Sequence, residues 1–134
     1  MRVTNWSLKA LFLGCSATAV ILLCSQLAYV LLASFIGSAA SASSFVGEHK
    51  ALLWFVLSII AYALSFFLGG FLTALLSIHR PIVHAVLVAM IVSGVSIFSV
   101  TDLNAINVNA LIMLMVGFAF SALGGYWGQE RLKL

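Results

Sequence analysis

Charged side chains are scarce in this chain. Only 7% of its 134 residues are Asp, Glu, Lys or Arg, whereas 64% are hydrophobic. Soluble domains carry about a quarter charged residues, which keep their surfaces solvated. This composition therefore excludes a soluble globular protein and predicts an integral membrane protein.

The charges that are present do not gather into a binding surface. The chain has a formal net charge of +3, but its basic residues are scattered along the whole sequence. Nucleic-acid-binding proteins cluster Lys and Arg on one face, together with aromatic side chains that stack on bases. We therefore expect no nucleic-acid partner, and we interpret the basic residues as determinants of membrane topology.

Carboxylates are missing from every long apolar stretch. Glu48, Asp102 and Glu130 all fall in expected loops or in the C-terminal tail. A proton-coupled exporter of this size, such as a small multidrug transporter, needs a carboxylate inside the membrane that exchanges protons for substrate. That class is therefore excluded. The fluoride channels of similar size are also excluded, because their asparagine and glycine-rich elements are not reproduced in order.

Residues that carry catalysis or bind cofactors are few and dispersed. Cys15 and Cys24 are nine positions apart, which places them on opposite faces of a helix where they cannot pair. Haem held by two histidines needs them on facing helices at similar depth, but His49 is expected on the outer side, and His79 and His84 on the inner side. Serine-based hydrolysis lacks an acid and a base. We predict no enzyme activity, no catalytic residue, no metal site and no cofactor.

Long apolar runs dominate what the sequence does contain. A bilayer core is crossed by about 20 helical residues. Apolar runs cover residues 10–37, 51–78, 82–100 and 106–127, and the third of them is close to the minimum spanning length. We interpret residues 38–44, SAASASS, as a connector of small residues. The sequence predicts an all-α fold in one domain, 1–134, with four transmembrane helices as two antiparallel hairpins.

The basic residues favour one orientation of these spans. With the N-terminus inside, five of the six basic residues are cytoplasmic and only Lys50 lies outside. Cytoplasmic loops carry an excess of Lys and Arg, so both termini are predicted to be cytoplasmic. We expect a multi-pass protein of a cell membrane, namely a bacterial inner membrane.

Aromatic residues near the span ends agree with an interfacial belt. These residues are Trp6, Trp54, Tyr126 and Trp127. Tyr29 and Tyr62 lie deeper in their spans, so each needs a partner for its hydroxyl group.

Small residues recur every four positions in each span. Helices in lipid associate through close backbone approach and side-chain hydrogen bonds, so such lines mark helix contacts. The packing residues that we predict are Gly14, Ala61, Ser65, Gly69, Gly70, Thr73, Gly117, Ser121 and Gly125. The lines of the first and second spans also include Ala10, Thr18 and Ser77, and the third span has a line of its own, Ala85, Ala89 and Ser93. One bundle does not need so many small residues internally, which favours contacts with further subunits.

A short element occurs twice. Leu-Gly-Gly-Phe at residues 68–71 recurs as Leu-Gly-Gly-Tyr at residues 123–126, which is 55 positions later. Parallel repeats of this kind occur in transporters. Two hairpins of one design and coincidence in a glycine-rich chain both remain open.

With Gly69-Gly70-Phe71 in span two, and Arg80-Pro81 with His84 at span three, the chain resembles small uncharacterised bacterial membrane proteins with four spans. Those proteins share a Gly-Gly-aromatic element late in span two, and a basic loop and a histidine at the start of span three. The resemblance implies a fold and a membrane location, but no activity.

Arg80 and His84 flank the predicted start of the third helix. Free N–H groups and the dipole at a helix N-terminus favour an anion, and basic residues at an inner leaflet attract acidic lipids. We interpret the pair as a candidate lipid or anion contact. The alternative is a neutral His84, hydrogen-bonded to a neighbouring helix or to interfacial water.

These features together predict a non-catalytic accessory or assembly subunit of a larger membrane complex. Its expected partners are membrane lipids and other membrane subunits or a second copy of itself. The alternative is a small transporter or channel formed by homo-oligomerisation, because one four-helix bundle fills its own interior. A pore would bring Ser, Thr and Gln26 together on a hydrated path, whereas an accessory subunit would pair them across helices.

Overall fold

The computed structural model is all-helical over the part of the chain that it describes, residues 3–42, 47–77, 80–100 and 108–133. Its helices are α1 (Val3–Ala42), α3 (Lys50–Leu76), α4 (Pro81–Val100) and α5 (Val108–Leu132). A helix satisfies all its backbone hydrogen bonds within one segment, which a chain in lipid requires. The predicted all-α fold is thereby confirmed.

Three of the helices are long and apolar enough to cross a membrane. The qualifying segments are Leu8–Ser38, Lys50–Leu76 and Val108–Leu132, which confirms that the chain is compatible with a membrane protein. Helix α4 has 20 residues, or about 30 Å at 1.5 Å per residue, and its described part, Pro81–Ser96, is apolar but shorter than those three segments. Whether α4 also spans the membrane stays a prediction.

Helix α1 is longer than its apolar run. It has 40 residues and continues through Ser38 to Ala42, so the connector predicted there is wrong, and residues 43–44 of that connector lie outside the described residues. Alanine favours helix, and Ser38 and Ser41 donate their hydroxyls to the carbonyls of Phe35 and Ser38 at 2.7 and 2.6 Å. The helix therefore needs no polar partner outside itself to continue.

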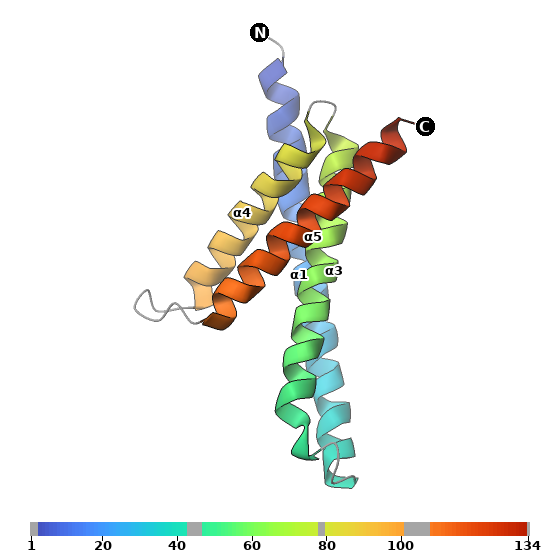
Figure 1. Ribbon diagram of the computed structural model, residues 1–134, viewed down its shortest axis with the longest axis vertical. Helices are drawn as coiled ribbons and strands as arrows, with labels where there is room; N and C mark the ends of the chain where they lie inside the picture. The colour runs from blue at the N-terminus through green and yellow to red at the C-terminus, as the bar shows by residue number, and fades with distance from the viewer. Residues whose placement is uncertain (1–2, 43–46, 78–79, 101–107, 134) are drawn as a thin grey trace.

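The helices alternate in direction (Figure 1). Helices α1 and α4 run one way and α3 and α5 the other, so that the start of α1 and the end of α5 lie at the same end of the molecule. We call this end the terminal end. Away from this end, the pair α4 and α5 diverges from the pair α1 and α3, and α1 and α3 continue further than α4 and α5 (Figure 1).

The interior contains few large side chains. Phe66, Val88, Ala89 and Val92 form its apolar cluster, and the ring of Tyr62 packs on Phe66 with centroids 4.5 Å apart. Most other buried positions hold glycine, alanine, serine or threonine. Large apolar side chains of all four helices face outward, as a lipid environment allows.

Candidate functional site

Helices α1 and α3 meet through two Gly-x-x-x-Thr elements, Gly14 with Thr18 and Gly69 with Thr73. The side chain of Thr18 lies against Gly69, and that of Thr73 lies against Gly14. Each threonine also donates its hydroxyl to the carbonyl of the glycine in its own element, at 2.7 Å in α1 and 2.6 Å in α3. All four residues are buried. In this reciprocal Gly–Thr pair, each glycine provides the space that the opposite threonine fills.

Helices α3 and α5 approach most closely at their glycines. A Cβ on Gly70 would meet the carbonyl of Ser121, and one on Gly124 would meet the carbonyl of Phe67. A Cβ on Gly128 would lie 2.7 Å from the Cβ of Ala74. We call Gly70, Gly124 and Gly128 the glycine crossing. Backbone atoms fill the space beside Gly70 and Gly124, so these positions admit no side chain without moving a helix.

Buried hydroxyl groups join the helices. Ser121 donates to the carbonyl of Ala85 at 2.7 Å, which links α5 to α4. The hydroxyl of Tyr62 donates to Ser93 at 3.2 Å, which links α3 to α4 and supplies the partner that the sequence requires for this tyrosine. The hydroxyl of Ser65 lies 3.4 Å from that of Ser25 on α1. The hydroxyls of Ser121 and Tyr62 thus link helices, whereas those of Thr18 and Thr73 bond within their own helices.

The small residues singled out in the sequence lie at these contacts. They are buried, except Ala61, which is half-buried and whose carbonyl accepts a hydrogen bond from Ser65 at 2.7 Å. The expectation that one bundle does not need so many small residues internally is wrong. Ala10, Ala85, Ala89 and Ser93 are each no more than 2% exposed within this single chain, so these extra lines are used internally.

Gly124 and Gly128 are packing residues that the sequence analysis missed. Their spacing of four residues is the Gly-x-x-x-Gly pattern of close helix contacts in membranes, and this was the available signal. Gly125, the residue that was predicted, points to the other neighbour. A Cβ there would lie 2.8 Å from the Cβ of Ala85 on α4.

The two Leu-Gly-Gly elements do not have equivalent surroundings. Gly69 faces α1 and Gly70 faces α5, whereas Gly124 faces α3 and Gly125 faces α4. Under a 55-residue repeat, Gly69 and Gly124 would contact corresponding partners. Instead, Gly69 meets α1, the other helix of its own hairpin, whereas Gly124 meets α3, which belongs to the other hairpin.

The turn between α3 and α4 places Arg80 and His84 near each other. Arg80 is exposed and has a left-handed backbone, with φ 52°, a conformation uncommon for any residue other than glycine. Its carbonyl accepts the backbone N–H of His84 at 3.3 Å and the ring Nδ1–H at 3.0 Å. His84 is therefore bonded to the residue that precedes its own helix. His79 lies outside the described residues.

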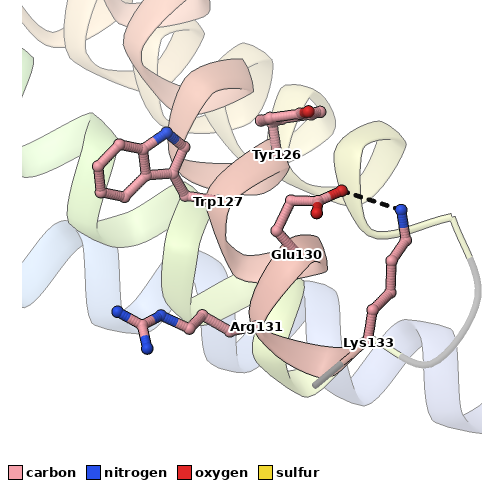
Figure 2. Close-up of a pocket in the computed structure, with 5 residues that line it drawn as sticks. All are labelled: Tyr126, Trp127, Glu130, Arg131 and Lys133. Atoms are coloured by element: carbon pink, nitrogen blue, oxygen red, sulfur yellow. Dashed lines mark hydrogen bonds and ion pairs between the residues drawn. The ribbon is translucent and has the colours of Figure 1, made fainter.

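An open pocket of about 380 Å³ lies at the C-terminal end of α5 (Figure 2). Its lining residues are Tyr126, Trp127, Glu130, Arg131 and Lys133. Lys133 pairs with Glu130 at 2.9 Å, and this hydrogen bond, together with the carboxylate charge, raises the pKa of Lys133. Arg131 extends away from that ion pair (Figure 2). From the sequence, Arg131 and Lys133 were expected to act in topology alone, and this pocket was not predicted.

The described residues hold no group of three or more His, Cys, Asp or Glu side chains placed to bind a metal ion. Comparison of the chain with known protein families, curated proteins and solved structures found no significant match. A functional conclusion for this chain therefore depends on its own geometry.

Proposed function

We propose that this chain is a non-catalytic integral membrane protein that serves as an accessory or assembly subunit of a larger membrane complex. It inserts as four spans with both termini in the cytoplasm, and its expected location is a cell membrane, namely a bacterial inner membrane. The observation that carries this proposal is that the hydroxyls of Ser121 and Tyr62 are used in hydrogen bonds between helices.

A transport path needs polar groups that face a hydrated space. Here the hydroxyls of Ser121 and Tyr62 are used in contacts between helices, and the helix crossing is filled by glycine against backbone. The outer surface is rich in large apolar side chains. The chain therefore has a tightly packed centre and an apolar exterior, and both suit a protein that binds other membrane helices.

The distribution of basic residues supports the proposed orientation. Arg80 and Arg131 belong to the terminal end, and Lys50 begins α3 at the opposite end. Cytoplasmic segments are enriched in Lys and Arg. We therefore assign the terminal end to the cytoplasm.

Labelling of introduced cysteines tests this orientation. In a background that carries Cys15→Ala and Cys24→Ala, single cysteines at residues 41–47 and 102–107 should react with a membrane-impermeant maleimide from the outside only. A cysteine at Lys133 is the matched control and should react from the inside only. Labelling of either loop from the cytoplasm alone would end this topology.

The terminal end also offers a contact for acidic lipid. Arg80, Arg131 and Lys133 are basic, and Tyr126 and Trp127 beside the last two suit the membrane interface. Each basic residue near an anionic leaflet contributes about 1 kcal/mol of attraction. These residues would hold the bundle at the inner leaflet without any enclosed binding site.

The subunit proposal is tested by what stays bound to the chain. The tagged protein is extracted from its native membrane with a mild detergent, cross-linked and analysed by mass spectrometry, with an unrelated tagged four-helix membrane protein as control. A larger membrane protein cross-linked to this chain in every preparation, and never to the control, is the expected result. Recovery of only the chain itself, as a closed ring of several copies that conducts ions in liposomes, would favour the channel alternative instead.

A further inference from the structure

Helix α1 has a second face, which the bundle does not use. Ser16, Ala19, Leu23, Gln26, Val30 and Gly37 lie along it and are all exposed. From Ser16 to Val30 their positions advance by alternating steps of three and four residues, and with half-buried Ala33 the alternation continues to Gly37. This period of about 3.5 residues is that of two helices that wind around each other with a left-handed twist. We call these six residues the outer α1 face.

Gln26 is the unusual member of the outer α1 face. It lies within one turn of the middle of the apolar segment Leu8–Ser38, and the described residues provide no hydrogen-bond partner for its side chain. A carboxamide has two N–H donors and an acceptor oxygen. Lipid tails satisfy none of them, so an unpaired carboxamide at this depth is unfavourable and promotes helix association.

We propose that the outer α1 face binds the same face of a second copy of this chain, in a parallel dimer with the two Gln26 side chains paired. Copies inserted with one orientation are related by a two-fold axis along the membrane normal, so α1 meets α1 with each residue at equal depth. A carboxamide both donates and accepts, and two of them form a mutual pair. A second copy is therefore a partner that meets Gln26 at the correct depth with complementary chemistry.

The rest of the outer α1 face suits close approach of two helices. Ala19 and Gly37 are small, and a Cβ on Gly37 would meet nothing within 4 Å. Leu23 and Val30 are 62% and 65% exposed, so they are available to pack between the two helices. At the end opposite the termini, α1 continues beyond α4 and α5 (Figure 1), which leaves room for a partner there.

This inference rests on the proposed insertion in a membrane, but it is tested separately from the subunit proposal. The experiment uses the purified full-length chain alone in phosphatidylcholine liposomes at low protein density. A monomer in liposomes would overturn the dimer and leave the search for a larger partner untouched. A dimer in liposomes would support the inference whatever the native membrane yields.

Disulfide cross-linking tests which face is used. In a background with Cys15→Ala and Cys24→Ala, we compare Val30→Cys on the outer α1 face with Leu31→Cys beside it. Both native side chains are 65% exposed and at the same depth, so collision alone would cross-link them equally. Copper–phenanthroline should link the Val30→Cys chains into dimers at least several-fold faster. Equal rates, or faster linking of Leu31→Cys, would refute the proposed face.

Substitution of Gln26 tests the hydrogen bond. Gln26→Leu replaces the carboxamide by an apolar side chain of similar size on an exposed position. Energy transfer between labelled copies should then show a dissociation constant about tenfold higher than that of the native chain. Gln26→Asn keeps the carboxamide and should stay within about threefold of the native chain. Unchanged association of Gln26→Leu, or equal loss in both variants, would contradict the pairing of Gln26 with itself.

Discussion

The glycine crossing allows a sharp prediction, because the addition of a single methyl group should have opposite effects at two glycines. Gly124 lies in α5 with the backbone of α3 beside it, and a Cβ there would meet the carbonyl of Phe67, with the amide nitrogen of Phe71 at 3.0 Å. Gly94 lies in α4, and a Cβ there would meet nothing within 4 Å. Both glycines are inside helices, so Gly→Ala increases the intrinsic helix propensity by the same amount at each position.

The expected difference follows from two opposing terms. Alanine favours helix over glycine by about 1 kcal/mol, and this is the whole effect expected for Gly94→Ala. Overpacking costs about 1 to 3 kcal/mol, and Gly124→Ala should reach the upper part of that range because backbone atoms cannot rotate away. Gly124→Ala should therefore lower the free energy of unfolding by about 2 kcal/mol, while Gly94→Ala raises it by up to about 1 kcal/mol.

Unfolding in mixed micelles of dodecyl maltoside with increasing SDS, followed by circular dichroism, measures both variants against the native chain. Tryptophan fluorescence gives a second readout, because the ring of Trp127 packs near Phe67 with centroids 6.1 Å apart. If the two variants change stability in the same direction and by the same amount, α3 and α5 do not cross at Gly124 and the packing described above is wrong.

Three further predictions concern other contacts. Gly69→Leu should lower the free energy of unfolding by about 1 to 3 kcal/mol, because Thr18 occupies the space beside Gly69. Leu68→Ile, at an exposed position, should change the free energy of unfolding little. Equal effects of the two variants in the same titration would place both residues on the lipid side. Ser121→Ala should lower the free energy of unfolding by about 0.6 to 1.7 kcal/mol, because it removes the hydrogen bond to α4. Ser77→Ala should leave the free energy of unfolding unchanged or raise it, because the buried hydroxyl of Ser77 has no partner in the described chain. A larger loss of stability in Ser77→Ala than in Ser121→Ala would contradict these assignments. Arg80→Gln should reduce the anionic lipid that co-purifies, measured by native mass spectrometry, without a change in unfolding; retention of the full lipid complement would remove the lipid role of Arg80.

The helical architecture follows from the sequence because it depends on composition and on the length of apolar runs. Lipid offers no hydrogen-bond partner for the backbone, so an apolar segment such as residues 51–78 satisfies its own backbone groups by forming a helix. The ends are less predictable. Helix α1 continues through Ser38 to Ala42 and α5 continues past Trp127 to Leu132, because small and charged residues at these points are compatible with helix even where they no longer suit the hydrocarbon.

The positions of close contact are also visible in the spacing of small residues, but the partners are not. Which helix lies against Gly69 or Gly124 depends on how each helix is rotated about its axis. Rotation is set by the fit of all contacts together, and adjacent glycines on one helix face different neighbours. The hydrogen bonds of His84 likewise depend on the backbone of Arg80, whose left-handed conformation has no signature in the residue type.

The structure places Gln26 in different surroundings from the hydroxyl groups with which the sequence groups it. Hydroxyl groups and Gln26 were expected to act together, either on a hydrated path or in contacts across helices. The hydroxyls of Ser121 and Tyr62 are bonded within the chain, while Gln26 is exposed on the outer side of α1. In the dimer that we propose, this polar group at mid-membrane depth serves a contact beyond the chain, so that the interior is used for packing within the chain and the outer α1 face for association.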